Sequence, residues 1–493
     1  MLTSLLRSSR RLPHASLRRF ATTTGTAAEP PSGPVGLLDD LSYRGYVQDV
    51  TDPRFLHDAL ESKPQVVYLG IDPTARSLHV GHLLPLMCLL HFHVRGHHVI
   101  PLIGGATGLI GDPAGRTTER ELANKETTSG NTVALVNSVE LFFKRALVYA
   151  DDRILLAADR MIDIRAKNNI AWHRDMTIMD FLRTVGRHSR INTMLNKDSV
   201  RTRLQSNAGM SFTEFTYQLL QAYDFYHLHK HFKCSLQVGG SDQWGNILAG
   251  ISLIDRIERS EAHAPNDLES TAPSNAPPRA YGLTTPLLTT ATGVKFGKTA
   301  GNAVWLDPQL TSVFNFYQYF VRTSDAEVES YLKLFTLLSW KEINETMESH
   351  RLQPEQRIAQ RRLASELTEL IHLKSGRVNA ETMTKIMFET ELAQVTAADV
   401  LTAFAGDRCV HMVDPEELTT VPVVRLAVKY GLAPSASAAR VLVLSRGLYY
   451  NNRPVPEIQF TLRQMHLLNE ELVILKAGKD KIAVLVAKKP EAN

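Results

Sequence analysis

Two apolar runs flank an apolar helical segment in the N-terminal part of the chain. The run Val66–Asp72 has the length and composition of a buried strand, and His98–Gly104 predicts a second strand. Between them, an apolar segment begins near His79 and ends at Gly96, as a helix closed by a glycine does. This strand–helix–strand order is typical of α/β domains that bind nucleotides, so we predict a parallel sheet.

The hydrophobic pattern then changes several times along the chain. We expect a helical region from about Asn131 to Leu228, a strand at Ser235–Gly239 and a helix starting near Ser241. Residues 260–280 are polar and rich in proline, which predicts a disordered surface insertion. Beyond about Asp325 the pattern is predominantly helical, and near Val421 it changes to a short helix-turn-helix followed by short strands. The predicted domains are therefore residues 35–325, 326–415 and 416–493.

The composition is typical of a soluble protein with ordinary buried cores. Of its 493 residues, 44% are hydrophobic and 22% charged, which suits two to four domains. No apolar run approaches the about 18 residues that a membrane-spanning helix needs, so no membrane partner is expected. Cys88, Cys234 and Cys409 are too scattered for a disulfide framework or a CxxC metal site. We therefore predict no metal ligands.

Residues 1–28 have the composition of a mitochondrial transit peptide. They contain five arginines and many serines and threonines, and no acidic residue precedes Glu29. This predicts a mature protein in the mitochondrial matrix. The alternative is a disordered basic arm that binds RNA.

Charge is distributed unevenly along the rest of the chain. The 55 basic and 51 acidic residues give a formal charge of +4, which falls to −1 without the five N-terminal arginines. Residues 421–493, however, hold 11 Lys or Arg against 5 Asp or Glu. Basic side chains on two short predicted helices there can contact RNA phosphates without reading bases. These candidates are Arg425, Lys429, Arg440 and Arg446.

An HxGH tetrapeptide lies where the first predicted strand leads into the apolar helix. Unpaired N–H groups at a helix start attract phosphate, and Gly81 leaves space for a nucleotide. His79 and His82 are three residues apart, so both imidazoles can face an α-phosphate as charge builds on it. In isolation the motif is weak, because it also occurs in nucleotidylyltransferases and resembles ordinary capping polarity.

Two glycine-containing loops add to this site. Residues 104–113, Gly-Gly-Ala-Thr-Gly-Leu-Ile-Gly-Asp-Pro, follow the second strand directly, and glycines let a backbone turn sharply beside a ligand. Far downstream, after a strand-like Pro286–Thr290, Lys295-Phe-Gly-Lys298-Thr places two lysines on a loop that can close over pyrophosphate.

The helix predicted over Ser211–Leu228 carries a polar stripe. Ser211 and Glu214 predict a capping box. Tyr217, Gln221 and Asp224 are spaced i, i+4 and i+7, where a packed helix normally presents hydrophobic residues. The stripe indicates either a ligand site or a solvent-facing helix side. Downstream, Gln237-Val-Gly-Gly-Ser-Asp-Gln-Trp244 again joins a strand to a helix, and a carboxylate at such a junction can bind ribose hydroxyls.

Together these segments resemble the class I aminoacyl-tRNA synthetases, and in particular the bacterial-type and mitochondrial tyrosyl-tRNA synthetases. His79–His82 is similar to the HIGH motif and Lys295–Thr299 to the KMSKS-type loop. The resemblance runs from about Leu37 to Asp325 and continues more weakly to the end, where Val423–Val455 resembles the S4 RNA-binding module. It implies a Rossmann-like α/β catalytic domain with a parallel sheet, an α-helical anticodon-binding domain and a small α+β S4-like domain.

The resemblance also implies roles for individual residues. Tyr68 and Asp224 would bind the phenolic hydroxyl of tyrosine. The catalytic set is Thr74, His79, His82, Lys295 and Lys298. The tyrosine-binding set is Tyr68, Asp72, Asp112, Tyr217, Gln221, Asp224, Gln237 and Gln243. The ATP-binding set is Gly70, His79, Gly81, His82, Arg116, Arg120, Gly240, Asp242, Lys295 and Lys298. Arg116 stands where a lysine is common, and Leu69 replaces a residue whose side chain can contact the ribose.

The activity that this resemblance implies is tyrosine–tRNA ligation: tyrosine is activated with ATP and Mg²⁺ and then transferred to the 3′ end of tRNA(Tyr), by a homodimer. A nucleotidylyltransferase is one alternative, although it has no use for the lysine loop or an RNA-binding tail. An RNA-binding or intron-splicing factor of synthetase descent is another. It predicts loss of residues such as His79, Lys298 or Asp224, all of which are present. Specificity for tryptophan is disfavoured because Tyr68 and Asp224 suit a phenol.

Overall fold

A computed structural model describes most of the chain. It covers residues 35–114, 123–157, 160–161, 163–204, 209–262, 277–288, 298–299, 302–388, 395–404, 407–478 and 481–488. The predicted transit peptide and most of the predicted insertion at 260–280 lie outside the described residues. The same is true of Arg116, Arg120 and Lys295.

The chain falls into two compact units. The first unit comprises Met1–Lys298 and Lys333–Trp340, and the second comprises Thr299–Leu332 and Lys341–Asn493. The short segment Lys333–Trp340 thus belongs to the first unit although its sequence neighbours belong to the second. The three-domain division at residues 325 and 415 stays a prediction.

A six-stranded sheet with the order β1-β6-β5-β2-β3-β4 forms the centre of the first unit. All neighbouring strands are parallel except β1, which runs antiparallel to β6 at one edge. The parallel α/β architecture predicted from the hydrophobic pattern is therefore confirmed. The strands are β1 (Asp49–Val50), β2 (Val66–Ile71), β3 (His98–Ile103), β4 (Lys167–Asn168), β5 (Cys234–Gly240) and β6 (Tyr281–Thr285).

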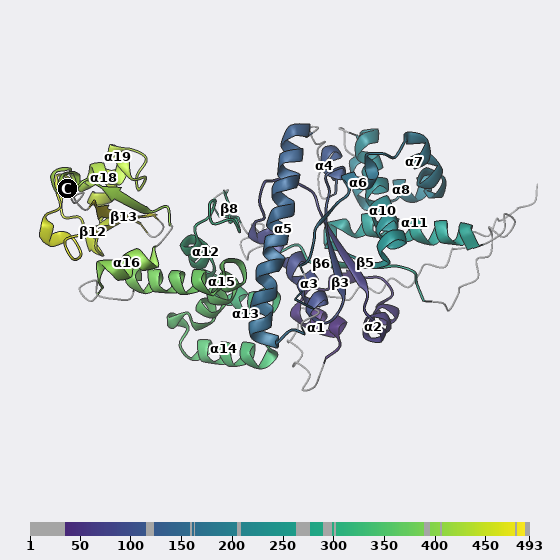
Figure 1. Cartoon of the computed structure of the whole chain (residues 1–493), viewed down its shortest axis with the longest axis horizontal. Helices are drawn as coiled ribbons and strands as arrows, with labels where there is room; N and C mark the ends of the chain where they lie inside the picture. Colours follow the sequence, from purple (N-terminus) through teal and green to yellow (C-terminus); the bar gives the residue numbers. More distant parts are fainter. Residues whose placement is uncertain are drawn as a thin grey trace, which may run out of the picture. The chain divides into compact units, whose positions relative to one another are not determined.

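Helices cover both faces of this sheet, with α3 and α5 on one face and α10 and α11 on the other (Figure 1). α3 is apolar almost all round and is buried over most of its length, as expected of a helix enclosed by other elements. The helices are α1 (Leu37–Arg44), α2 (Pro53–Ser62), α3 (Leu83–Val94), α4 (Thr107–Ile110), α5 (Lys125–Ile154), α6 (Ile170–His173), α7 (Ile178–Thr184), α8 (Ile191–Leu195), α9 (Asp198–Leu204), α10 (Phe212–Phe232) and α11 (Trp244–Ala262), with the 3-10 turns η1 (Val80–His82), η3 (Gly186–His188) and η4 (Ser241–Gln243).

Two predicted boundaries were wrong. The helical region expected over 131–228 is interrupted, because α5 ends at Ile154 and β4 joins the sheet beside β3. A strand of two residues is too short to leave a periodic pattern in the sequence. The strand-like segment predicted at Pro286–Thr290 is not a strand over its described part, residues 286–288, because β6 ends at Thr285, before a proline that has no N–H for a ladder hydrogen bond.

α10 begins as predicted after Ser211, whose hydroxyl accepts a hydrogen bond from the Glu214 N–H at 3.3 Å. The Glu214 carboxylate forms a buried ion pair with Arg203, at 2.8 Å between Oε2 and Nη2. Arg203 also donates to the Gly209 carbonyl. A buried guanidinium without such partners would be very costly, so this pair holds the start of α10 in place.

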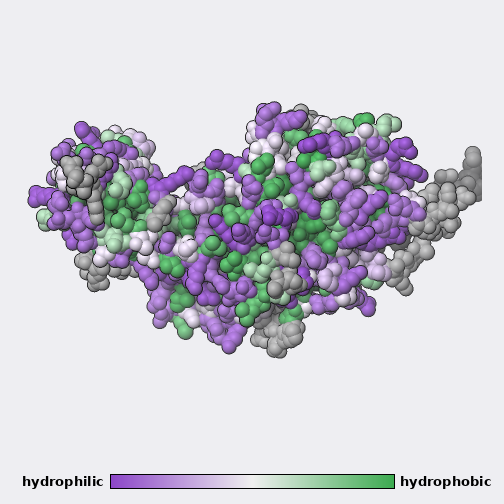
Figure 2. Space-filling view, in the orientation of Figure 1, coloured by the Kyte–Doolittle hydropathy of each residue, from purple (hydrophilic) through white to green (hydrophobic). Residues whose placement is uncertain are grey.

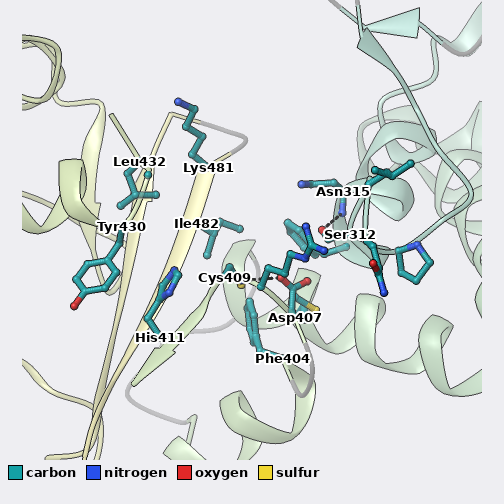
Figure 3. Close-up of a pocket in the computed structure, with 17 residues that line it drawn as sticks. Ser312, Asn315, Phe404, Asp407, Cys409, His411, Tyr430, Leu432, Lys481 and Ile482 are labelled. Atoms are coloured by element: carbon teal, nitrogen blue, oxygen red, sulfur yellow. Dashed lines mark hydrogen bonds between the residues drawn. The ribbon is translucent and has the colours of Figure 1, made fainter. Parts of the chain in front are cut away.

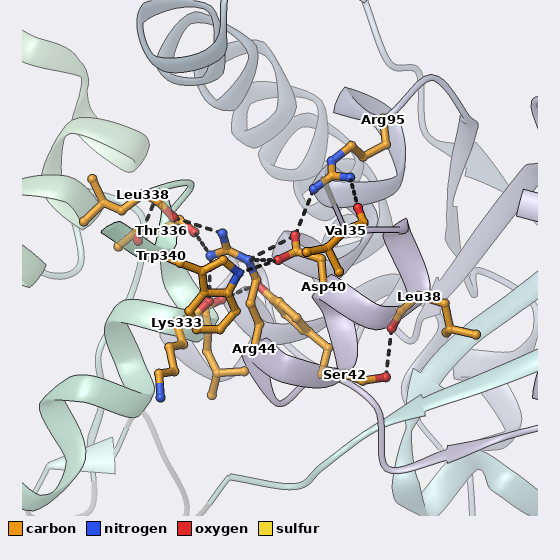
Figure 4. Close-up of polar contacts among 12 residues, drawn as sticks. Val35, Leu38, Asp40, Ser42, Arg44, Arg95, Lys333, Thr336, Leu338 and Trp340 are labelled. Carbon is orange, nitrogen blue, oxygen red and sulfur yellow. Dashed lines mark hydrogen bonds and ion pairs between the residues drawn. The ribbon is translucent and has the colours of Figure 1, made fainter. Parts of the chain in front are cut away.

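A polar cluster fastens the segment Lys333–Trp340 to α1 within the first unit (Figure 4). The buried Arg44 guanidinium donates to Asp40 and to the carbonyls of Thr336 and Leu338, at 3.2 and 2.9 Å. Asp40 also accepts from the indole N–H of Trp340, at 3.1 Å. Buried carbonyls at the end of a helix need hydrogen-bond donors. Arg44 supplies these donors to the carbonyls in the turn after α13.

The second unit combines a helical part with a small mixed sheet. The sheet has the order β11-β10-β12-β13-β9 and packs against α17, α18 and α19 through an apolar core. The helix-turn-helix predicted near Val421 corresponds to α18 and α19. The elements are α12 (Val313–Val321), α13 (Asp325–Phe335), α14 (Trp340–Leu352), α15 (Ile358–Phe388), α16 (Ala397–Ala403), α17 (Pro415–Thr420), α18 (Val423–Lys429), α19 (Ala436–Leu444), β9 (Val410–Val413), β10 (Leu448–Tyr450), β11 (Arg453–Pro454), β12 (Leu472–Ala477) and β13 (Lys481–Ala487). The short strands β7 (Lys298–Thr299) and β8 (Asn302–Ala303) pair with each other.

Hydrophilic side chains predominate on the visible face of the molecule, with smaller hydrophobic patches between them (Figure 2). Within the described ranges, no helix combines the length and the apolar character that crossing a membrane requires.

Candidate active site

The candidate site lies at the carboxyl ends of β2, β3 and β5. Strand order reverses between β2 and β5, and ligands of open α/β sheets bind at such switch points. Gly70 is exposed near the end of the otherwise buried β2, and a Cβ added there would meet no atom within 4 Å. The predicted nucleotide position at Gly70 therefore has open space beside it.

The polar stripe of α10 points inward, as predicted for a ligand site. Tyr217 and Asp224 are both buried. The Asp224 carboxylate accepts three side-chain hydrogen bonds: at Oδ1 from Trp172 Nε1 and His173 Nε2, both at 2.7 Å, and at Oδ2 from Asn169 Nδ2 at 2.9 Å. A buried carboxylate needs donors of this kind, so Asp224 is held in one orientation.

A second carboxylate, Asp72, follows β2 and is linked to Asp224 through hydrogen bonds. Asp72 accepts from the hydroxyls of Tyr217 and Thr107, both at 2.8 Å. Asn169 bridges the two carboxylates, because its Nδ2 also lies 3.1 Å from Thr107 Oγ1. A Cβ on Gly104 would lie 2.1 Å from Asp72 Oδ1, so the network requires glycine there.

Asp112 and two glutamines form a third hydrogen-bonded group in the candidate site. Gln243 donates to Asp112 Oδ2 at 2.6 Å, and Gln221 donates to Gln243 at 3.2 Å. The structure therefore brings together predicted tyrosine-binding residues from α10, η4 and the loop after β3, which are distant in sequence.

Three buried polar atoms of the predicted set have no hydrogen-bond partner among the described residues. One is Gln221 Oε1 on α10, and the others are Tyr68 Oη and Gln237 Oε1, on neighbouring strands in direct register. Burial, followed by the charge of Asp224, raises the pKa of Tyr68 well above its usual range, so Tyr68 keeps its hydroxyl proton. Because buried polar atoms are normally satisfied, these three mark candidate positions for a polar ligand.

His79 and His82 cap the 3-10 turn η1 with defined tautomers. His79 Nδ1 accepts from the Gly81 N–H, and His82 Nδ1 accepts from the His79 N–H, each at 3.1 Å. Since an accepting nitrogen of a neutral imidazole carries no proton, the proton sits on Nε2 of each ring. Burial is the main cause that lowers the pKa of His82 to about 3, so this imidazole is neutral at physiological pH. The pair can therefore offer N–H donors without adding positive charge.

Other predicted residues are placed less completely. Thr74 and Asp242 are exposed beside the site, and Gly240 ends β5. Arg116, Arg120 and Lys295 lie outside the described residues, as does the side chain of Lys298. In the part of the chain that the structure describes, no three His, Cys, Asp or Glu side chains are grouped to hold a metal ion.

Sequence reasoning missed four residues that organise the network. Thr107 lies in the predicted glycine loop, but Asn169, Trp172 and His173 lie within the region that was expected to be helical. One signal could have located them: Asn168 and Asn169 are consecutive, and asparagine disfavours helix interiors because its side chain hydrogen-bonds nearby backbone.

The second unit carries the predicted RNA-binding residues and a cavity. Arg425, Lys429, Arg440 and Arg446 are all exposed, and Lys429 is paired with Glu417. A separate cavity of about 400 Å³ lies between the start of α12 and the small sheet (Figure 3). Its lining includes the ring pair Tyr430 and His411, 4.9 Å apart, with the cations Arg408 and Lys481.

Comparison with known proteins places these features in context. The family described as tRNA synthetases class I (W and Y) matches residues 60–389. The mitochondrial tyrosine–tRNA ligase of Saccharomyces cerevisiae is 38% identical over 454 residues, covering 91% of this chain and 88% of that protein. Tyrosine–tRNA ligase 1 of Bacillus subtilis is 39% identical over 452 residues, covering 92% and 99%. The crystal structure of a C-terminally truncated Aspergillus nidulans mitochondrial tyrosyl-tRNA synthetase matches with a TM-score of 0.64 and 38% identity, over 72% of this chain and 95% of that chain.

Proposed function

Because the chain belongs to the class I tRNA synthetases of the tryptophan and tyrosine group, we propose that it activates L-tyrosine with ATP and transfers it to tRNA(Tyr). The observation that carries the choice of tyrosine is the buried pair of Asp224, held by three donors, and Tyr68, whose hydroxyl has no partner among the described residues. A phenolic hydroxyl can donate to the carboxylate and accept from Tyr68.

The same two groups, Asp224 and Tyr68, discriminate tyrosine from phenylalanine. Phenylalanine would leave Asp224 and Tyr68 with unmade hydrogen bonds in a buried place, which costs about 1–3 kcal/mol per group. The ammonium group of tyrosine binds at the other end of the network, where Asp112, Tyr217 and Gln221 gather.

Activation is an in-line displacement at phosphorus. The tyrosine carboxylate attacks the α-phosphate of ATP, which enters as its Mg²⁺ complex, and the bond to the β-phosphate breaks to release pyrophosphate. The neutral imidazoles of His79 and His82 donate from Nε2 to the phosphate oxygens as negative charge develops. Lys295 and Lys298 act on the departing pyrophosphate. In the second step a hydroxyl of the terminal adenosine attacks the activated carbonyl, and AMP leaves.

The second unit binds the transfer RNA. Arg425, Arg440 and Arg446 are exposed for phosphate contacts. The cavity lined by Tyr430, His411 and Arg408 suits an unstacked base, because RNA loops are recognised by splaying bases onto aromatic rings and guanidinium groups.

A homodimer accounts for exposed apolar side chains on three neighbouring helices of the first unit. α7 exposes Ile178 and Leu182, and α8 exposes Ile191 and Leu195, each pair at i, i+4 on one helix side. Phe212 at the start of α10 is 79% exposed. Large exposed apolar groups mark interaction surfaces, and a two-fold dimer would pair this surface with itself. Phe212→Asp should give monomers in analytical ultracentrifugation, and a variant that stays dimeric would contradict this interface.

The protein works in the mitochondrial matrix, with residues 1–28 as the import signal. A fluorescent protein fused to these residues should enter mitochondria, and replacing the five arginines with glutamine should leave it in the cytosol.

The central experiment is pyrophosphate exchange into ATP, with tyrosine, phenylalanine and tryptophan offered separately to the chain from Ala28 onward. Exchange with tyrosine alone, followed by charging of tRNA(Tyr), is the expected result. Exchange with tryptophan would reassign the substrate. No exchange in a folded protein that still binds RNA would favour the splicing-factor alternative.

A further inference from the structure

His173 is tied to the candidate hydroxyl pocket by a single short contact. Its Nε2 lies 2.7 Å from Asp224 Oδ1, and both side chains are almost completely buried. Since the acceptor is a carboxylate, Nε2 carries the proton that is donated. The edge of the imidazole packs against the Tyr223 ring, at 5.6 Å between centroids. These contacts fix the ring in the orientation that serves Asp224.

The two oxygens of Asp224 are used unequally. Oδ1 accepts from both Trp172 and His173, which fills the two lone-pair positions of that oxygen. Oδ2 accepts from Asn169, so one of its positions is left for a further donor within the described network. Tyr68 Oη is buried and has no hydrogen-bond partner in the described chain, and the charge of Asp224 contributes to raising the pKa of Tyr68. The donors on Oδ1 thus direct an incoming hydroxyl to Oδ2.

We propose that His173 is a positioning residue for substrate selection, which completes the saturation of Asp224 Oδ1 and so directs the phenolic hydroxyl of tyrosine to Oδ2. This inference rests on the proposed function. Trp172 and Asn169 make further contacts, so substituting them would disturb more than the hydrogen bond to Asp224. Trp172 stacks on His227 at 4.3 Å between ring centroids, and Asn169 is also hydrogen-bonded to Ala106 and Thr107. His173 is therefore the place where the hydrogen bond can be removed with least disturbance.

Removing the donor at position 173 opens a second acceptor position on Asp224. The carboxylate can then turn or take up water, and the hydroxyl of tyrosine no longer meets a single prepared acceptor. Hydrogen bonds to charged groups are worth about 1.5–3 kcal/mol, which corresponds to about 10-fold or more in the ratio of kcat/KM for tyrosine over phenylalanine. The KM for ATP should not change, because His173 lies at the phenol end of the network.

The test compares His173→Gln, His173→Asn and His173→Leu in the full chain by pyrophosphate exchange. Glutamine carries its amide nitrogen as many bonds from Cβ as Nε2 of histidine, whereas asparagine is one bond shorter and leucine has no donor. We expect His173→Leu and His173→Asn to raise the KM for tyrosine and lower the tyrosine/phenylalanine ratio about 10-fold, and His173→Gln to keep the ratio near that of the parent. His231→Leu, on the exposed side of α10, is the matched control and should change neither quantity.

The outcomes distinguish a failure of the positioning role of His173 from a failure of the proposed function. A parent protein without tyrosine-dependent exchange would overturn the proposed function itself. If the parent is active but His173→Leu keeps its tyrosine/phenylalanine ratio, or loses activity with both amino acids equally, the positioning role is wrong. If the leucine variant does not fold, equal ratios for the glutamine and asparagine variants would overturn the role just as directly.

Discussion

The charged side chains of the candidate tyrosine pocket and those of the second unit lie in opposite environments. Asp224 is buried and receives three hydrogen bonds from fixed donors, whereas Arg425, Arg440 and Arg446 are exposed. Inside the protein each unmade hydrogen bond is costly, but exposed charges are screened by salt and act additively. The comparison teaches that amino-acid selection should depend on single atoms, while RNA affinity should be spread over many contacts.

The largest effect on activity is expected from substituting His79, where the helix-capping role and the catalytic role of the side chain can be tested separately. In His79→Asn the amide oxygen can still accept the Gly81 N–H, but the Nε2 donor is lost. We expect kcat for tyrosine activation to fall about 10²–10³-fold, with the free energy of unfolding changed by less than about 1 kcal/mol. Pre-steady-state adenylate formation and urea unfolding measure the two quantities. A variant as unstable as His79→Ala would mean that the cap was not retained.

The two carboxylates of the network should respond differently to the same amide substitution. Asp72 is bonded by the hydroxyls of Tyr217 and Thr107, which can turn and accept instead of donate. The indole and amide N–H groups around Asp224 cannot reverse in this way. Asp224→Asn should therefore lower the free energy of unfolding by about 1–3 kcal/mol and abolish discrimination against phenylalanine.

Asp72→Asn is the matched control for that variant. It should cost less than about 1 kcal/mol in urea unfolding and keep tyrosine preferred over phenylalanine in pyrophosphate exchange. Equal losses of stability in the two variants would refute the distinction between reversible hydroxyl donors and fixed nitrogen donors.

Burial also makes the first unit sensitive to acid. Burial is the main cause that lowers the pKa of His97 from 6.5 to about 4, and His97 Nδ1 accepts the Gln65 N–H at 3.1 Å. Between these two pH values the unfolded chain binds more protons than the folded one, so the free energy of unfolding should decrease as the pH falls from 6.5 to about 4. His97→Gln, which keeps an acceptor but does not titrate there, should flatten this dependence in urea unfolding. An unchanged slope would exclude His97 as its source.

The smallest effect is expected in the second unit. Arg440→Ala or Arg446→Ala should weaken tRNA binding a few-fold and reduce the salt slope of log K by about 1 or less, without changing pyrophosphate exchange. Lys429→Ala should matter less still, because Lys429 is already paired with Glu417. Filter binding at several salt concentrations checks this order, and a loss of tyrosine activation in any of the three variants would contradict the separation of the two regions.

Much of the fold could be predicted because its signals are local. β2, β3 and the start of α10 follow from short apolar runs and from Ser211, which caps the helix within one turn. The polar stripe of α10 was recognised because Tyr217, Gln221 and Asp224 recur at helical spacing. The motifs at His79–His82 and Lys295–Thr299 gave the family, and the comparisons bear it out. β4 was missed because a strand of two residues is too short to show a periodic hydrophobic pattern.

Sequence alone determined most of the elements, the polar face of α10 and which residues are candidates for the chemistry, because these signals depend on neighbours within one or two turns. Only the tertiary structure decided which donors meet Asp224. Asn169, Trp172 and His173 lie more than 50 residues before it and reach it because the short strand β4 and the helix after it follow β3 in the sheet. No periodicity along the chain encodes that meeting, since the geometry of hydrogen bonds between distant segments exists only once the sheet has brought them together.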